Sequence, residues 1–168
     1  MNDRVIQFGA IYWFFDTKTE VFHEERVINQ FINTDVEISD GAFAVHWITK
    51  EKLSVFKKMD AYIKEFLAYI EKSSFLIAHN LDFDLALLKK EASLCHAWYD
   101  FTKKSTICTM KNKNVIEYMW WGKRPKLQEL HEKLFGRKFE SAHDALADIR
   151  ATKDCFIELY KRWKIILF

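Results

Sequence analysis

Residues 141–148, Ser141-Ala142-His143-Asp144-Ala145-Leu146-Ala147-Asp148, decide how this chain is interpreted. The pattern predicts a helix from about Asp144 to Trp163, because an aspartate before an apolar-periodic segment is a common helix N-cap. His143 then lies at the mouth of that helix, and Asp148 lies about one turn inside it. A histidine and an aspartate at a helix start are most often capping residues, and Asp144 fits that role. A functional role for His143 and Asp148 therefore needs evidence from other parts of the chain.

A second informative stretch, Ala78-His79-Asn80-Leu81-Asp82-Phe83-Asp84, supplies that support. The apolar run Phe75–Ala78 is typical of a short buried strand, and a helix is expected from Asp84 to Ala92. Open α/β sheets place their sites at the carboxyl ends of strands. Asp84 and Asp148 are therefore expected to reach the same edge of the sheet, with Asp82 as a turn residue beside Asp84.

The rest of the chain alternates between extended and helical patterns. A β-hairpin is expected from Val5–Phe15 and Val21–Ile32, joined by the turn residues 16–19. Ser39 and Thr49 are N-cap candidates, and Gly136 is a candidate left-handed C-cap of a helix lined by leucines. The expected core stripe of one further helix consists of Met59, Tyr62, Ile63, Phe66, Leu67 and Ile70. With another strand at Ser105–Cys108, the expected fold class is α/β, a mixed central sheet with flanking helices.

Composition indicates one folded domain over residues 1–168. Hydrophobic residues make up 49% and charged residues 30% of the chain, and only 4 Gly and 1 Pro interrupt it. The three cysteines, Cys95, Cys108 and Cys155, have no C-x-x-C spacing, which argues against a disulfide framework and a thiolate zinc site. Neither a signal-peptide pattern nor a membrane-spanning apolar run is evident. We therefore expect a cytoplasmic protein with reduced thiols and no membrane contact.

The net charge of +2 is unevenly distributed. Residues 1–99 carry 11 basic and 15 acidic side chains, a net −4, whereas residues 100–168 carry 15 basic and 9 acidic, a net +6. A phosphate-facing rim is one interpretation of the basic half, and an ordinary solvated face is the other. The candidate rim residues are Lys103, Lys104, Lys111, Lys113, Lys123, Arg124, Lys126, Arg137 and Lys138.

The chemistry that fits these residues is phosphodiester hydrolysis. Two-metal hydrolysis needs carboxylates that converge on two divalent ions about 4 Å apart. Asp84 and Asp148 are the candidate carboxylates. His143 is the candidate general base, because the ordinary pKa of histidine, about 6.5, suits proton abstraction from a bound water. An HD-type phosphohydrolase also uses a His-Asp pair, but such proteins are all-helical and the N-terminal half of this chain is rich in strand patterns.

These motifs together resemble those of DnaQ-like 3′-to-5′ exonucleases of the DEDDh branch, which have a ribonuclease H-like fold. Residues 79–84 resemble the second motif, H-N-x-x-F-D, and His143 with Asp148 resembles the third, H-x-x-x-x-D. Further segments agree in order from residue 3 to about 160, among them Asp3–Ala10, Ile38–Ala42, Val45–Thr49 and Lys126–Gly136. The resemblance implies that Asp148 ligates metal directly, that Asp84 does so largely through water, and that His143 activates the attacking water. It also places Asn80 and His46 against the terminal nucleotide.

The sequence departs from this family in two places. The first family motif, a D-x-E on the first strand, is expected before residue 1; Phe15-Asp16-Thr17-Lys18-Thr19 imitates it but has Lys18 in place of glutamate and falls in the predicted hairpin turn. Without that motif two Mg²⁺ or Mn²⁺ ions meet only two protein carboxylates, which weakens metal binding without forbidding it. Trp47 stands where the family usually has glycine, and either stacking on a base or simple packing would explain it.

The expected function is metal-dependent removal of nucleotides from nucleic-acid 3′ ends, as in proofreading or trimming. The alternative is a nucleic-acid-binding pseudo-exonuclease or accessory subunit that lacks the first metal motif. The expected partner is a nucleic-acid 3′ end, with single-stranded DNA favoured, and a polymerase or a second chain is possible. Because the first strand of the family lies inside the sheet, we expect the hairpin to pair directly with Phe75–Ala78 or with a strand from another chain.

Overall fold

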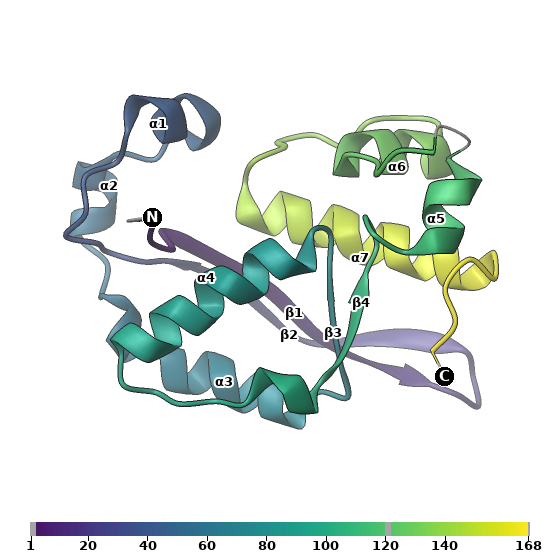
Figure 1. The fold of residues 1–168 in the computed structure, drawn as a ribbon, viewed down its shortest axis with the longest axis horizontal. Helices are drawn as coiled ribbons and strands as arrows, with labels where there is room; N and C mark the ends of the chain where they lie inside the picture. The colour runs from purple at the N-terminus through teal and green to yellow at the C-terminus, as the bar shows by residue number, and fades with distance from the viewer. Residues whose placement is uncertain (1–2, 120–121, 168) are drawn as a thin grey trace. The chain divides into compact units, whose positions relative to one another are not determined.

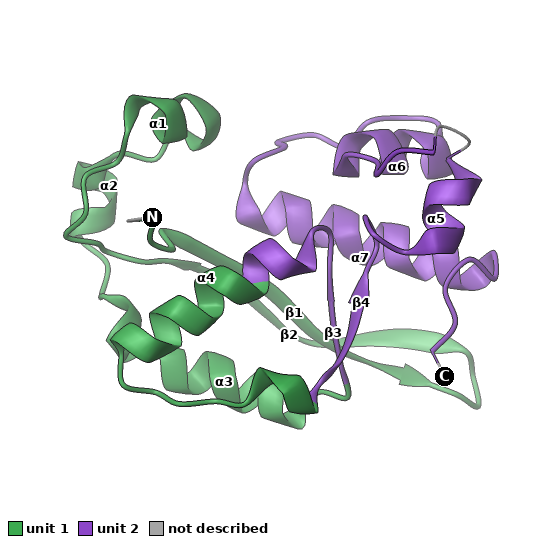
Figure 2. Cartoon of the chain, viewed as in Figure 1, with its two compact units in different colours: residues 1–74, 85–103 green, residues 75–84, 104–168 purple. Residues whose placement is uncertain are grey.

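The structure, a computed structural model, describes residues 3–119 and 122–167. The chain divides into two compact units, each built from two segments (Figure 2). Unit 1 contains Met1–Ser74 and Leu85–Lys103, and unit 2 contains Phe75–Asp84 and Lys104–Phe168. Both units contain helices and strands (Figure 1), so the α/β class expected from the sequence is confirmed. The single-domain organisation stays a prediction.

Unit 1 contains the predicted β-hairpin. Strands β1 (Gln7–Asp16) and β2 (Val21–Phe31) pair antiparallel from Gln7 opposite Phe31 to Asp16 opposite Val21, with an irregularity in register at Tyr12 and Trp13. The turn forms because an Asp16 carboxylate oxygen accepts the Lys18 backbone N–H at 2.8 Å, as aspartate does in Asx turns. The segment that imitates the first family motif is therefore part of a strand end and its turn, as expected.

The short helices of unit 1 begin at the residues that the sequence indicated. Ser39 caps α1 (Asp40–His46) by accepting the Ala42 N–H at 3.3 Å, and Thr49 caps α2 (Lys50–Ser54) by accepting the Lys52 N–H at 3.2 Å. A 3₁₀ turn η1 (Met59–Ala61) leads into α3 (Ile63–Lys72), and a second, η2, covers Phe101–Lys103. The predicted stripe of α3 is buried chiefly through Met59, Ile63, Phe66 and Leu67, which is how an amphipathic helix is held on its core.

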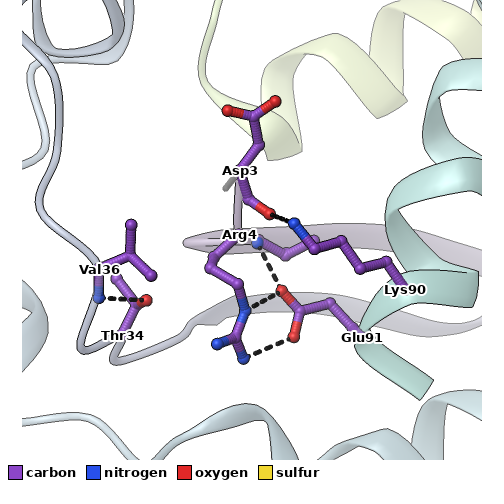
Figure 3. A network of polar contacts seen from close by, with 7 residues as sticks. Asp3, Arg4, Thr34, Val36, Lys90 and Glu91 are labelled. Carbon is purple, nitrogen blue, oxygen red and sulfur yellow. Dashed lines mark hydrogen bonds and ion pairs between the residues drawn. The ribbon is translucent and has the colours of Figure 1, made fainter. Parts of the chain in front are cut away.

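A buried ion pair fixes the start of the chain on the long helix α4 (Leu81–Leu94) (Figure 3). Glu91 is 1% exposed, and both of its carboxylate oxygens accept hydrogen bonds from the Arg4 guanidinium at 2.8 Å. The Val5 backbone N–H adds a third bond at 2.9 Å, and Lys90 Nζ donates to the Asp3 carbonyl at 2.7 Å. Since a buried carboxylate needs such partners, residues 3–5 are held before β1 begins.

Unit 2 contains the second pair of strands and the helices that form its core. Strands β3 (Phe75–Ala78) and β4 (Ser105–Cys108) are parallel, as expected for strands joined by a helix. Helices α5 (Lys113–Tyr118), α6 (Leu127–Phe135) and α7 (Ala145–Lys161) follow. The side chains that α7 buries recur at helical spacing and are Ala151, Thr152, Cys155, Phe156 and Leu159. Gly136 ends α6 at φ 73°, the predicted left-handed C-cap.

The structure corrects three sequence-based expectations. Among the described residues β1 pairs with β2 and β3 pairs with β4 in two separate two-stranded sheets, so direct pairing of the hairpin with Phe75–Ala78 is not found. Helix α4 begins at Leu81 rather than Asp84, because the Asn80 carbonyl already accepts the Phe83 N–H at 2.9 Å. Helix α5 was not anticipated. No helix in the described ranges combines the length and apolar character needed to cross a bilayer.

Candidate functional site

The N-terminus of α7 brings two of the predicted site residues together. Asp144 is the N-cap, as predicted, and its Oδ1 accepts the N–H groups of Leu146 and Ala147 at 3.1 and 3.0 Å. Asp148, in the first turn, accepts the backbone N–H of His143 on Oδ1 at 3.3 Å. A carboxylate in the first turn is also stabilised by the helix dipole. The five-residue spacing therefore forms one compact constellation.

The backbone before α7 has an unusual conformation. His143 lies at φ 76° and Ser141 at φ 57°, and left-handed conformations cost non-glycine residues free energy. The hydrogen bond from Asp144 N–H to the Ser141 carbonyl at 3.1 Å closes this turn. His143 is exposed to solvent. The turn thus presents the exposed residue His143 directly before α7, with its backbone N–H bonded to the partly buried Asp148 carboxylate.

Burial raises the pKa of both candidate metal-binding carboxyl groups. For Asp148 the hydrogen bond from the His143 backbone N–H opposes this increase. Burial raises the pKa of Asp84 to about 6, with a smaller opposing effect from its own backbone N–H. The Asp84 residue still has an exposed surface, so protein atoms surround the carboxyl group without closing it from water. Such carboxylates favour a cation or a proton close by.

Asp84 and Asp82 lie two residues apart in the first turn of α4 but have different environments. Asp82 forms an ion pair with Lys111 and is 73% exposed. Burial, and not a neighbouring cation, is what raises the pKa of Asp84 within the described part of the chain. Asn80, immediately before the helix, lies at φ 74°, a conformation that asparagine tolerates better than most residues. Of the two aspartates, Asp84 is therefore the one available for a ligand.

His79 was not predicted as a site residue, although it begins the H-N-x-x-F-D stretch. Its Nε2 lies 3.0 Å from the Pro125 carbonyl, which can only accept, so Nε2 carries the proton. Its Nδ1 then accepts from the Thr109 hydroxyl at 2.9 Å. Burial lowers the pKa of His79. The neutral ring links the end of β3 to two later segments of unit 2 and thereby holds the loop that contains Asn80.

His46 belongs to unit 1, whereas the other four predicted site residues belong to unit 2. Its Nδ1 accepts the Ile48 N–H at 3.0 Å, and burial lowers its pKa. Trp47, at the left-handed C-cap of α1, is 72% exposed and contacts Phe43 edge to face, with ring centroids 5.4 Å apart. The indole of Trp47 is therefore not buried within unit 1.

Within the described part of the chain, no three or more His, Cys, Asp or Glu residues gather closely enough to form a metal cluster. The donor set still fits a divalent cation in part. Asp84 and Asp148 each offer carboxylate oxygens, and burial raises the pKa of both. Oxygen donors of this kind suit Mg²⁺, which is commonly held by one or two carboxylates together with substrate phosphates.

Several members of the predicted basic rim have local acidic partners. Lys111 pairs with Asp82, Lys113 lies 4.0 Å from Glu117, and Lys123 lies 3.3 Å from Glu129. Other residues of the predicted basic rim that are exposed in unit 2 include Arg124, Arg137 and Lys138. Any phosphate attraction by the rim therefore depends more on these arginines and Lys138 than on the paired lysines.

Comparison with known proteins gives a consistent result. The family model described as exonuclease, RNase_T, matches residues 1–156. The curated proteins contain no match to this chain.

Three solved structures similar to this chain are each distant from it in sequence. Exonuclease X in complex with 5′ overhanging duplex DNA is 18% identical, with a TM-score of 0.63 over 96% of this chain and 86% of that one. The nuclease domain of 3′hExo, a DEDDh family member bound to rAMP, is 18% identical, with a TM-score of 0.71 over 95% and 82%. A 3′-exonuclease in a structure concerned with recognition of histone mRNA stem-loop 3′ ends is also 18% identical, with a TM-score of 0.69 over 95% and 72%.

Proposed function

This chain belongs to the DnaQ-like exonuclease family, and we propose that it removes nucleotides from the 3′ end of a nucleic acid with the help of divalent metal ions. The observation that carries the proposal is the contact between His143 and Asp148 at the start of α7. The His143 backbone N–H donates this bond to the partly buried Asp148 carboxylate, and His143 itself is exposed and lies in a strained turn. Strained backbone is common at functional sites.

Each site residue has a role in this proposal. Asp148 and Asp84 would hold the metal, Mg²⁺ or Mn²⁺, and burial raises the pKa of both carboxyl groups, which favours a cation close to them. When bound, the metal would neutralise charge on the scissile phosphate and lower the pKa of water. The His143 imidazole would serve as the general base that accepts a proton from the attacking water. Asn80 and His46 orient the terminal nucleotide.

The substrate proposed is single-stranded DNA, and the chain is proposed to act in the cytoplasm. Exonuclease X and 3′hExo, to which this fold is similar, were solved with DNA and with rAMP respectively. Single strands are preferred here because a free 3′ end must leave its stack to meet the site. A polymerase or a second copy of the chain remains a candidate partner.

The test is a nuclease assay on a 15-nucleotide single strand labelled at its 5′ end. We expect a ladder of products shortened one nucleotide at a time, with Mn²⁺ more effective than Mg²⁺, because Mg²⁺ demands near-ideal octahedral geometry. His143→Ala and Asp148→Asn should each abolish the ladder. A phosphorothioate at the 3′-terminal linkage should block it, and a block only at the 5′ end should not.

The matched control is a pair of variants on one helical turn. Asp84→Asn should lose activity, whereas Asp82→Asn should keep it, since Asp82 is occupied by Lys111. Cleavage that survives EDTA, or a fully active Asp148→Asn variant, would contradict the assignment. Binding of the strand without any cleavage in Mn²⁺ would favour the second function, a pseudo-exonuclease that only binds nucleic acid.

A further inference from the structure

A pocket of about 400 Å³ lies at the end of α7 opposite to the candidate site. Asn114, Glu117 and Tyr118 of α5 line it, together with Trp163 and Lys164 of the segment after α7. All five residues belong to unit 2. Asp148 and Trp163 are separated by roughly 22 Å along the chain direction of α7, at about 1.5 Å per residue. The pocket is therefore a separate feature.

Trp163 occupies a position in which glycine is normally preferred. Its N–H donates to the Tyr160 carbonyl at 2.9 Å, and the Lys164 N–H donates to the Leu159 carbonyl at 2.9 Å. These are the two bonds of a Schellman C-cap, whose left-handed residue is usually glycine. Trp163 takes this conformation at φ 57° and leaves its ring 81% exposed. The free-energy cost of this strained backbone is not offset by burial of the indole. Strained positions without a compensating contact are often functional sites.

The pocket wall around this tryptophan is firmly held. Arg162 Nη1 donates to the Tyr118 hydroxyl at 2.7 Å, Nε to Glu158 at 2.7 Å, and Nη2 to the Leu134 carbonyl at 3.1 Å. One guanidinium therefore connects α5, α6 and α7. Ile165, two residues after Trp163, is 2% exposed and anchors the segment in the core. The ring of Trp163 is thus presented on a preformed support, which reduces the entropy lost on binding.

The charge around the pocket is suited to an anionic ligand. The Nζ atoms of Lys164 and Lys133 lie 5.5 and 5.7 Å from the centre of the Tyr118 ring. Glu117 also lines the pocket and lies 4.0 Å from Lys113 Nζ. Asn114 and Glu117 can hydrogen bond to the edge of a base, and lysines attract phosphate. An aromatic platform beside cations is the combination that binds single-stranded nucleic acid.

We propose that this pocket binds the nucleic-acid strand away from its 3′ end, with one base stacked on the Trp163 indole and a neighbouring phosphate paired with Lys164. The inference rests on the proposed function for the identity of the strand. A path of roughly 22 Å corresponds to about six stacked nucleotides at about 3.4 Å each. The pocket therefore favours strands long enough to reach it. Its polar lining favours nucleic acid over a lipid surface.

The test is the binding of a 5′-fluorescein-labelled dT20 strand, followed by fluorescence anisotropy in EDTA so that no cleavage occurs. Trp163→Ala should weaken binding by about tenfold, since stacking of one base on an aromatic ring contributes on that scale. Trp163→Tyr should restore most of the affinity. The matched control is Trp98→Ala in unit 1, which removes an indole that is 83% exposed and should change nothing.

Two further variants separate binding from folding. Trp163→Gly should raise Tm by about 2–4 °C by relieving the left-handed strain, yet should bind as weakly as Trp163→Ala. Lys164→Glu should reduce the slope of log affinity against log salt by about 0.7.

The outcomes distinguish this inference from the proposed function. The inference is overturned if Trp163→Ala binds dT20 as tightly as the unaltered chain does. It is also overturned if the unaltered chain does not bind dT20. Both conclusions hold whether or not cleavage occurs in Mn²⁺. Binding of phosphatidylserine vesicles that depends on Trp163, with dT20 affinity unchanged, assigns the pocket to a membrane and also overturns it. Loss of cleavage with Trp163-dependent dT20 binding intact refutes only the proposed exonuclease activity.

Discussion

The Arg4 and Glu91 ion pair permits a quantitative prediction of stability. Glu91 is 1% exposed and accepts three hydrogen bonds, two of them from Arg4. Arg4→Met removes those two and leaves a buried carboxylate with only the Val5 N–H. Breaking such a pair from one side costs about 3–5 kcal/mol, a large share of the roughly 5–15 kcal/mol that stabilises a typical domain. The midpoint of urea unfolding should fall by about 1–2 M.

The double variant separates the ion pair from simple packing. Arg4→Met combined with Glu91→Met should recover most of the lost free energy of unfolding, because no buried charge is left unpaired. Arg26→Met is the control: Arg26 lies 3.6 Å from Glu65, but both side chains are at least half exposed, so the loss should stay below about 0.5 kcal/mol. Urea titrations followed by circular dichroism measure all four chains. A loss below 1 kcal/mol for Arg4→Met, or a double variant no more stable than the single one, would refute this reasoning.

Three further predictions concern unit 2. Arg124→Glu should flatten the salt dependence of strand binding more than Lys123→Glu, because Lys123 already lies 3.3 Å from Glu129; equal effects would contradict this. Gly136→Ala should cost about 1 kcal/mol by calorimetry, from backbone strain at φ 73° alone, since a Cβ there meets no atom within 4 Å. Burial lowers the pKa of His79 in the folded protein. Because the unfolded chain binds this proton more readily, the free energy of unfolding should fall as pH drops below about 6.5. The fall should end once the pH is below the lower pKa of the folded state. His79→Gln should flatten that pH profile, and an unchanged profile would assign the loss to other groups.

Local features of the fold and site could be predicted from sequence. Ser39, Thr49 and Asp144 cap helices through hydrogen bonds that span two or three residues. The turn at Asp16 and the C-cap at Gly136 are equally local. The contact between His143 and Asp148 is local in the same way, because the two residues are only five positions apart at the start of one helix. Features of this kind depend only on residue type and short-range backbone geometry.

Longer-range contacts could not be predicted in this way. Arg4 and Glu91 are 87 residues apart, and His79 bonds to Thr109 and Pro125 across two further segments. The pairing of Lys111 with Asp82, which leaves Asp84 as the available carboxylate, is likewise non-local. Direct pairing of the hairpin with Phe75–Ala78 is not found among the described residues, because strand order depends on which edges meet in space. Pairing with a strand from another chain stays a prediction. A periodic apolar pattern specifies only that a strand is buried, and does not name its neighbour.

The sequence by itself determined the family of this protein, its α/β class and the short motifs that contain Asp84 and His143. Each of these depends on residues that are close together in the chain. Only the tertiary structure decided the environments of these residues: which carboxyl groups are desolvated, which cations are neutralised, and that Trp163 stands exposed on a strained C-cap above a preformed pocket. The physical reason is that desolvation and charge pairing depend on every atom within a few ångströms. Those atoms come from segments that lie far apart in the chain.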